Sequence, residues 1–158
     1  MQLWSVQLNK PKVMQNEVKA PLTAEQQRNL ETVNALFAAF AMGDVPAILS
    51  LCADDCEWHH GGDPDAIPFA KKFTGKTGVG EFFQSVGQSI SVSGIAPTNF
   101  VAAGSEVSHD FHVEATVNAT GKSYVADVRY VWTFDERGNI CRHRSHGDFS
   151  SAEAAFRA

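Results

Sequence analysis

The chain has little of several features that mark large classes of protein. Its 158 residues include only three cysteines, Cys52, Cys56 and Cys141. An odd count without dense spacing predicts reduced core thiols rather than a disulfide framework. Lysine and arginine number 13 against 18 aspartates and glutamates, and they form no basic run. Because a nucleic-acid surface needs a concentrated basic patch, we expect no nucleic-acid partner.

Long hydrophobic runs are also missing. No stretch approaches the roughly 20 apolar residues that cross a bilayer, so we expect no membrane partner. The opening MQLWSVQLNKPK lacks the apolar core of a secretory signal, which leads us to expect a cytoplasmic protein. A hydrophobic fraction of 44% is sufficient for a globular core. The length predicts one domain.

We divide the chain into an N-terminal arm, residues 1–22, and a domain, residues 23–158. Pro11 and Pro21 interrupt the arm. The arm is either a partly ordered tail or a segment whose Trp4 docks on the body or on a partner subunit. The domain begins with a capping-box pattern, in which Thr23 and Gln26 satisfy each other's backbone amides.

Three helices and one early strand are predicted in the first half of the domain. Apolar residues at helical spacing follow Thr23, and Gly43 ends this first helix. Asp44 begins a second helix. The segment CEWHH then forms a short strand, GGDPDAIP a loop, and the residues after FTGKTG a third helix.

After Gly94 the pattern changes from helical spacing to alternation. It predicts four strands at about 95–103, 106–118, 123–134 and 139–148, joined by turn sequences such as ATGK and DERGN. Helices followed by an antiparallel meander predict an α+β domain, in which a cone-shaped, curved antiparallel sheet wraps around three N-terminal helices.

Strand alternation decides which side chains face the interior of this cone. The aromatic side of SYVADVRYVWTF includes Tyr130 and Trp132, which leaves Asp127 and Arg129 outside, where they can pair with Glu114, Arg142 or Arg144. In the last strand, one side carries Arg142 and Arg144, whose burial without partners would be costly. We therefore predict that the other side faces the interior: Cys141, His143, Ser145 and Gly147. His60 shares a side with Trp58, so we predict His60 inside and His59 outside. Asp54 and Asp55 are expected to face solvent.

Several motifs resemble the SnoaL-like and ketosteroid isomerase-like proteins of the nuclear transport factor two-like superfamily. The stretch ALFAAFAMGDVPAILSLCADDCEWHHGGD resembles their opening helices and first strand. FTGKTGVGEFF resembles their third helix, and VWTFDERGNICRHRSHGD their final hairpin. The resemblance covers about residues 30–150. It implies the cone-shaped α+β barrel, which hosts enzymes, ligand carriers and association modules.

The resemblance also assigns positions to known catalytic groups. The general-base aspartate of the isomerases matches His60, and their oxyanion-hole aspartate matches Tyr130. Their oxyanion tyrosine falls near Leu36. The catalytic aspartate of the cyclases matches Ser145, where the related epoxide hydrolases also need an acid. Neither catalytic set is intact in this chain.

The residues predict acid–base chemistry on a small apolar molecule, with no cofactor. His60 is the expected base, Tyr130 a hydrogen-bond donor to a developing enolate, and His143 a second proton shuttle or donor. The expected substrate-binding residues form a water-excluding lining: Trp58, Phe83, Phe111, Val113, Trp132 and Ser145.

Two alternatives stay open at this point. The same cone could hold a ligand without chemistry or serve as a dimerisation module, and a homodimer through the outer sheet face is expected. The other alternative is a metal site at which His60, His109 and His143 meet near Cys52 and Cys56. The two cysteines lack the usual spacing of zinc ligands, so we expect no metal.

Overall fold

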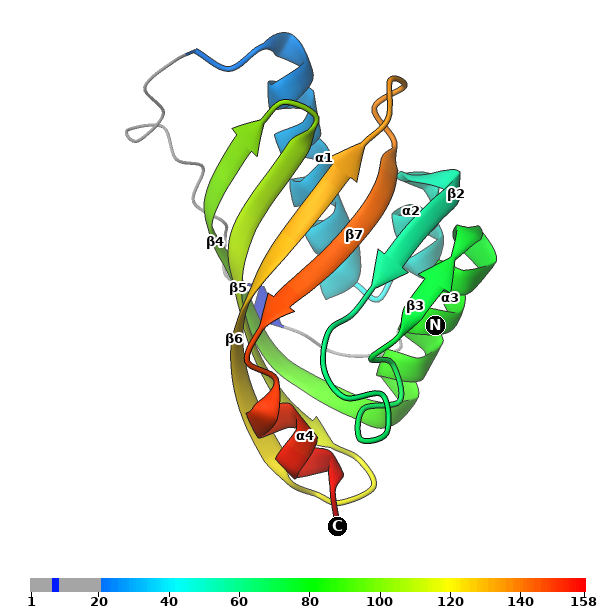
Figure 1. Cartoon of the computed structure of the whole chain (residues 1–158), viewed down its shortest axis with the longest axis vertical. Helices are drawn as coiled ribbons and strands as arrows, with labels where there is room; N and C mark the ends of the chain where they lie inside the picture. The colour runs from blue at the N-terminus through cyan, green and yellow to red at the C-terminus, as the bar shows by residue number, and fades with distance from the viewer. Residues whose placement is uncertain (1–6, 9–20) are drawn as a thin grey trace.

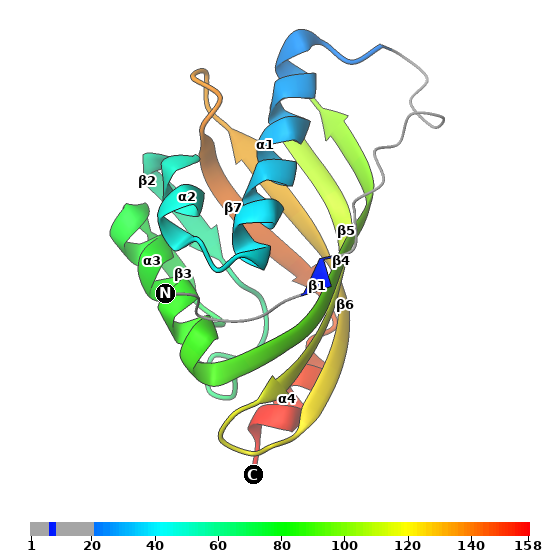
Figure 2. The same cartoon turned by 180° about the vertical axis from the view of Figure 1, so that it is seen from behind.

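The computed structural model describes residues 7–8 and 21–158, and it has the predicted α+β architecture (Figure 1). A curved sheet carries three helices on its concave side, and Figure 2 shows these helices from the opposite direction. They are α1 (Ala24–Ala41), α2 (Val45–Ser50) and α3 (Gly75–Ser89). The predicted arm lies largely outside the described residues, as does Trp4.

The helix starts follow the predicted local chemistry. Thr23 Oγ1 accepts a hydrogen bond from the Gln26 amide at 3.0 Å, and Gln26 Oε1 accepts one from the Thr23 amide at 3.1 Å. This confirms the capping box. Gly43 lies just beyond α1 with φ +67°, a conformation that favours glycine. Asp44 caps α2 through the Ala47 amide, as predicted.

Among the described residues, the sheet has seven strands in the order β1-β4-β5-β6-β7-β2-β3. The strands are β1 (Gln7–Leu8), β2 (Cys52–His59), β3 (Lys72–Thr74), β4 (Ile90–Ala103), β5 (Glu106–Val117), β6 (Ser123–Phe134) and β7 (Ile140–Gly147). From β4 to β7 the pairing is antiparallel, as predicted. β2 instead joins β7 in parallel, which brings the early strand beside the last one.

Four local features differ from the predicted elements. β4 begins at Ile90 rather than near residue 95, so it follows α3 directly. The short β3 and a fourth helix, α4 (Ser150–Phe156), were not predicted. β2 also carries a bulge: its register against β7 shifts between Cys52 and Glu57. Asp54 and Asp55 lie in this bulge and are exposed, as expected, although they belong to a strand.

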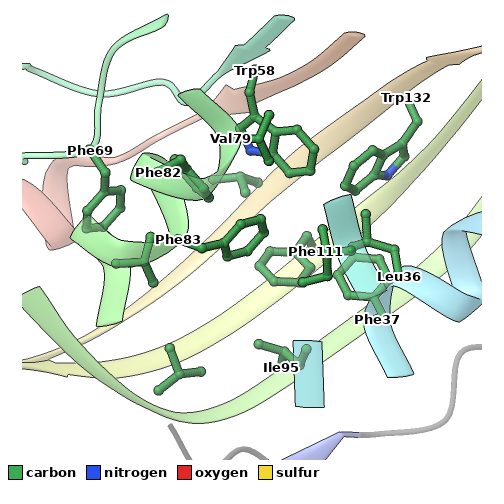
Figure 3. Packing of buried hydrophobic residues seen from close by; sticks show 14 of the residues in the cluster. Leu36, Phe37, Trp58, Phe69, Val79, Phe82, Phe83, Ile95, Phe111 and Trp132 are labelled. Carbon is green, nitrogen blue, oxygen red and sulfur yellow. The ribbon is translucent and has the colours of Figure 1, made fainter. Parts of the chain in front are cut away.

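The core lies between the concave face of the sheet and the helices. Figure 3 shows aromatic side chains from β2, α3, β5 and β6 pointing toward one another across this space. Trp58 and Trp132 lie 5.3 Å apart between ring centroids, and the buried set extends through Phe37 and Phe111. Within the described residues, no helix is long and apolar enough to cross a membrane.

Candidate active site

His60 lies at the open end of β2, one residue beyond the strand. Its backbone amide donates to the Lys71 carbonyl at 3.3 Å, which holds the residue against the start of β3. Its ring is packed between Phe69, Phe82 and Phe149, at centroid distances of 4.9, 5.9 and 5.2 Å. The residue is half-buried, and its ring faces the interior while the neighbouring His59 is exposed.

Hydrogen bonding fixes the tautomer of His60. Its Nδ1 lies 2.6 Å from the Gly61 carbonyl oxygen. A carbonyl can only accept, so Nδ1 carries the proton and Nε2 keeps its lone pair. The Gly61 amide donates in turn to Ser145 Oγ at 2.9 Å. Burial lowers the pKa of His60 to about 4, so the imidazole is neutral at pH 7.

Tyr130 reaches the interior from the middle of β6. Its ring stacks on Phe111 with a centroid distance of 4.2 Å and meets the edge of His143 at 4.5 Å. Within the described residues its hydroxyl makes no hydrogen bond, and burial raises its pKa. The hydroxyl is therefore a protonated donor at neutral pH and is not engaged by a described neighbour.

His143 is buried on β7, between the two tryptophans. Its ring stacks on Trp132 at 4.0 Å and lies 4.7 Å from Trp58. Its Nδ1 makes no well-formed hydrogen bond to any described residue. Burial lowers the pKa of His143 well below its ordinary value, and repulsion from His60 and His109 lowers it further. His143 is thus a neutral base inside the aromatic core.

These three residues line two small cavities that share Tyr130. The first has a volume of about 40 Å³ and is bordered by Tyr130 and His143. The second, about 20 Å³, is bordered by His60 and Tyr130. Cavities of this size hold one to a few water molecules. Ligand pockets typically measure about 300–1,000 Å³, so in this conformation the interior is mostly filled by side chains.

The predicted lining residues divide between these cavities. The larger is lined by Trp58, Phe83, Phe111 and Trp132, and the smaller by Val113. Ser145 is buried as expected but lines neither, because its hydroxyl is bound to the Gly61 amide. Ser145 therefore holds Gly61, the residue whose carbonyl accepts the hydrogen bond from His60 Nδ1.

Sequence reasoning missed two parts of the site. The first is the bond between Trp132 Nε1 and His109 Nε2, at 2.9 Å, in the buried core. It makes His109 Nε2 the acceptor, so Nδ1 donates to the Asp110 carbonyl at 2.8 Å. Burial lowers the pKa of His109 to about 4. His109 has both ring nitrogens engaged, which marks it as structural.

The second missed part is the end of the chain. Phe149 packs against His60, and Ala152 of α4 lines the smaller cavity. The run AEAA within α4 consists of good helix formers, and this was the signal that could have revealed α4.

The histidines do not form a metal centre. Among residues 21–158, no group of three or more histidine, cysteine, aspartate or glutamate side chains is arranged to hold a metal ion. Cys52 and Cys56 are buried free thiols, and Cys52 donates to the Ile48 carbonyl.

A larger concavity lies away from His60 and His143. It measures about 420 Å³ and lies on the outer face of the sheet. Its charged groups are paired with each other: Arg129 with Asp110 at 2.9 Å, and His112 with Asp127 at 2.7 Å. The predicted outward direction of Asp127 and Arg129 is correct, but their partners differ from those expected. We place the candidate site inside the cone, where the unengaged groups are.

Solved structures resemble this fold over most of the chain. A nuclear transport factor two-like protein from Burkholderia xenovorans has a TM-score of 0.72 and 24% identity, covering 83% of this chain and 97% of its own. TerC, solved with polyporic acid, has a TM-score of 0.71 and 23% identity, covering 83% and 99%. A candidate isomerase from Bacillus subtilis has a TM-score of 0.71 and 22% identity, covering 85% and 96%.

Because each identity is below 25%, these likenesses establish the fold alone. A search of curated proteins found no match. The family model of the SnoaL-like domain matches residues 33–143, from the middle of α1 to His143 on β7. The chain therefore belongs to the SnoaL-like domain family, with the cone fold that its sequence motifs predicted.

Proposed function

We propose that this SnoaL-like domain is a cofactor-independent isomerase, cyclase or lyase that moves a proton on a small apolar carbonyl compound. The observation that carries the proposal is the state of His60. The Gly61 carbonyl holds Nδ1 in its protonated form, which leaves the Nε2 lone pair available in a neutral ring beside Tyr130. A base and a hydrogen-bond donor in one water-poor space are what proton transfer next to a carbonyl requires.

In this mechanism, His60 Nε2 removes a proton from the carbon next to the substrate carbonyl. The electron pair moves onto the carbonyl oxygen, and the Tyr130 hydroxyl donates to the resulting enolate. The protonated His60 then returns the proton to the same or another carbon. A base with a pKa of about 4 is weak, so stabilisation of the enolate has to supply much of the acceleration.

His143 has a second role in the proposal. It lies beside the Tyr130 ring, and its Nδ1 lacks a well-formed hydrogen bond. It can therefore relay a proton, or donate to a substrate oxygen that lies deeper in the cone. The fold neighbour solved with polyporic acid supports the general idea that this architecture is used around small organic molecules.

The test uses deuterium exchange on carbonyl compounds. A panel of apolar cyclic ketones in D2O, followed by proton NMR, reports removal of the α-proton whatever product is formed. We expect His60→Ala to lower the exchange rate roughly 10²–10⁴-fold and Tyr130→Phe about 10²–10³-fold. His59→Ala is the matched control, since His59 is the exposed neighbour on the same strand. Unchanged rates in His60→Ala would refute the proposal.

A second candidate function is supported by the packing of the interior. Trp58 and Trp132 fill much of the space that a ligand would need, at 5.3 Å from each other. A cone filled in this way suits a non-catalytic association module, with a homodimer through the outer sheet face. No exchange on any ketone of the panel, together with a dimer by analytical ultracentrifugation, would favour this function over catalysis.

A further inference from the structure

The wall of the cone beside His60 is built from the end of the chain. Phe149 packs on the His60 ring at 5.2 Å, and Ala152 lines the smaller cavity together with His60 and Tyr130. Phe156, at the other end of α4, packs on Phe69 at 5.9 Å. Figure 1 shows α4 lying across the lower ends of β5 and β6, beside the loop between β2 and β3.

Something in this wall has to move before an organic molecule can reach Nε2. The cavities of about 20 and 40 Å³ are far below the size of a ligand pocket. The sheet strands are held by backbone ladders to their neighbours, and α1 buries Leu30, Val33, Leu36 and Phe37 in the core. Neither of these walls can move without unfolding much of the domain.

α4 is held much more weakly. It has seven residues, its N-cap Phe149 makes no side-chain capping bond, and within the helix only Ala152 and Ala155 are buried. Gly147, the last residue of β7, has φ +143°, a conformation open to glycine, and only Asp148 and the N-cap Phe149 lie between it and α4.

Polar bonds fasten this helix at two places. At the loop after β2, Asp63 Oδ2 pairs with Arg157 at 2.8 Å, and the Asp63 amide donates to Glu153 Oε2 at 2.7 Å. At the β5–β6 turn, Thr120 Oγ1 donates to the Ala155 carbonyl at 2.7 Å, and Lys122 Nζ to the Arg157 carbonyl at 2.8 Å. The two contacts of Arg157 are exposed and therefore individually weak, and the other two are only partly buried.

We propose that the segment from Phe149 to Arg157 is a hinged lid, latched through Asp63, that opens as a unit in the folded protein and exposes the His60 end of the cone. The proposal rests on the proposed function only in taking this cavity as the ligand site. The lid itself follows from the packing, the latch and the hinge.

Hydrogen–deuterium exchange with mass spectrometry on the full chain tests the lid. We expect peptides spanning 61–70 and 150–157 to exchange together, at least about tenfold faster than peptides from β5 and β6, because local opening needs less free energy than global unfolding. The double variant Glu153→Ala/Arg157→Ala should speed exchange in 150–157 by roughly threefold to twentyfold, the effect of losing two weak polar contacts to Asp63. Alanine keeps the helix propensity of α4, so a weaker intrinsic tendency to form the helix cannot explain faster exchange.

The matched control is Glu136→Ala/Arg137→Ala, the same change of residue types at the exposed β6–β7 turn, where neither side chain has a partner in the latch. It should leave 150–157 unchanged. Exchange of 150–157 at the rate of β5 and β6 would overturn the lid, as would an equal acceleration of all peptides in the latch variant. Because exchange requires no substrate, the lid can fail while the ketone assay succeeds, or the reverse.

Discussion

Acid should destabilise this protein through its buried neutral histidines, and His109 allows the effect to be isolated. Its side chain is fully buried, and both ring nitrogens are engaged in the neutral form, one accepting from Trp132 and one donating to Asp110. Protonation would place a second donor against the Trp132 N–H. Burial is the main reason for a folded pKa of about 4, and the positive charge of Arg129 also lowers this pKa.

The sign and size follow from proton linkage. The unfolded chain binds a proton at His109 near pH 6.5 and the folded chain only near pH 4, so the unfolded state binds more protons between these values. Stability is therefore complete above about pH 6.5 and is lost as the pH falls toward 4. Between pH 7 and pH 5 the loss from this one group is about 2 kcal/mol, a large part of an ordinary domain stability of about 5–15 kcal/mol.

The assay is urea unfolding of the wild type and of His109→Gln at pH 7 and pH 5. Glutamine can accept from Trp132 and does not titrate, so the variant should lose less stability than the wild type over this interval, by about 2 kcal/mol. His59→Gln controls for removal of a surface histidine. Equal losses in wild type and His109→Gln would refute the reasoning.

His112 has the opposite effect on stability. Glu114 and Asp127 raise the pKa of His112, so the stability that its protonated form contributes is lost as the pH rises above 6.5.

Three further predictions concern single contacts. Trp132→Phe removes the donor to His109 and should lower the free energy of unfolding by about 1–3 kcal/mol in urea denaturation; no loss would show that the bond is replaced. Gly61→Ala would place a methyl group 2.5 Å from the Phe149 ring, so we expect a loss of about 1–3 kcal/mol, with faster hydrogen exchange in 150–157. His112→Gln removes exposed ion pairs only, and at pH 6 it should cost about 0.2–1 kcal/mol; a larger loss by thermal or urea unfolding would contradict a surface role.

Strand alternation predicted much of the interior correctly. The aromatic side of β6 and the choice of His143 and Ser145 on β7 required only the two-residue period and the cost of burying arginine. His60 could be placed inside because it lies two residues after Trp58 and therefore points to the same side, even though β2 ends at His59. The capping motifs at Thr23 and Asp44 were equally local, and both formed as predicted.

What the sequence could not predict depends on contacts between distant elements. The size of the cavity follows from how rings from β2, α3, β5 and β6 interlock, and no local pattern encodes that. The hydroxyl of Ser145 is bound to Gly61, 84 residues away, which gave it a supporting role instead of a place in the lining. The bulge in β2 escaped notice because it moves the Asp54–Asp55 pair outward without altering the apolar pattern on either side.

The parallel pairing of β2 with β7 has a consequence for the order of folding. Glu57 and Arg142 face each other although 85 residues separate them, so β2 can pair with β3 early but must wait for β7 before it joins the rest of the sheet. Helices α1 and α2 and the β4–β6 meander can form from nearer contacts, whereas this join closes a loop of 85 residues. On the ribosome, the His60 corner is therefore the last part of the domain to be completed, and its assembly requires nearly the whole chain to have emerged.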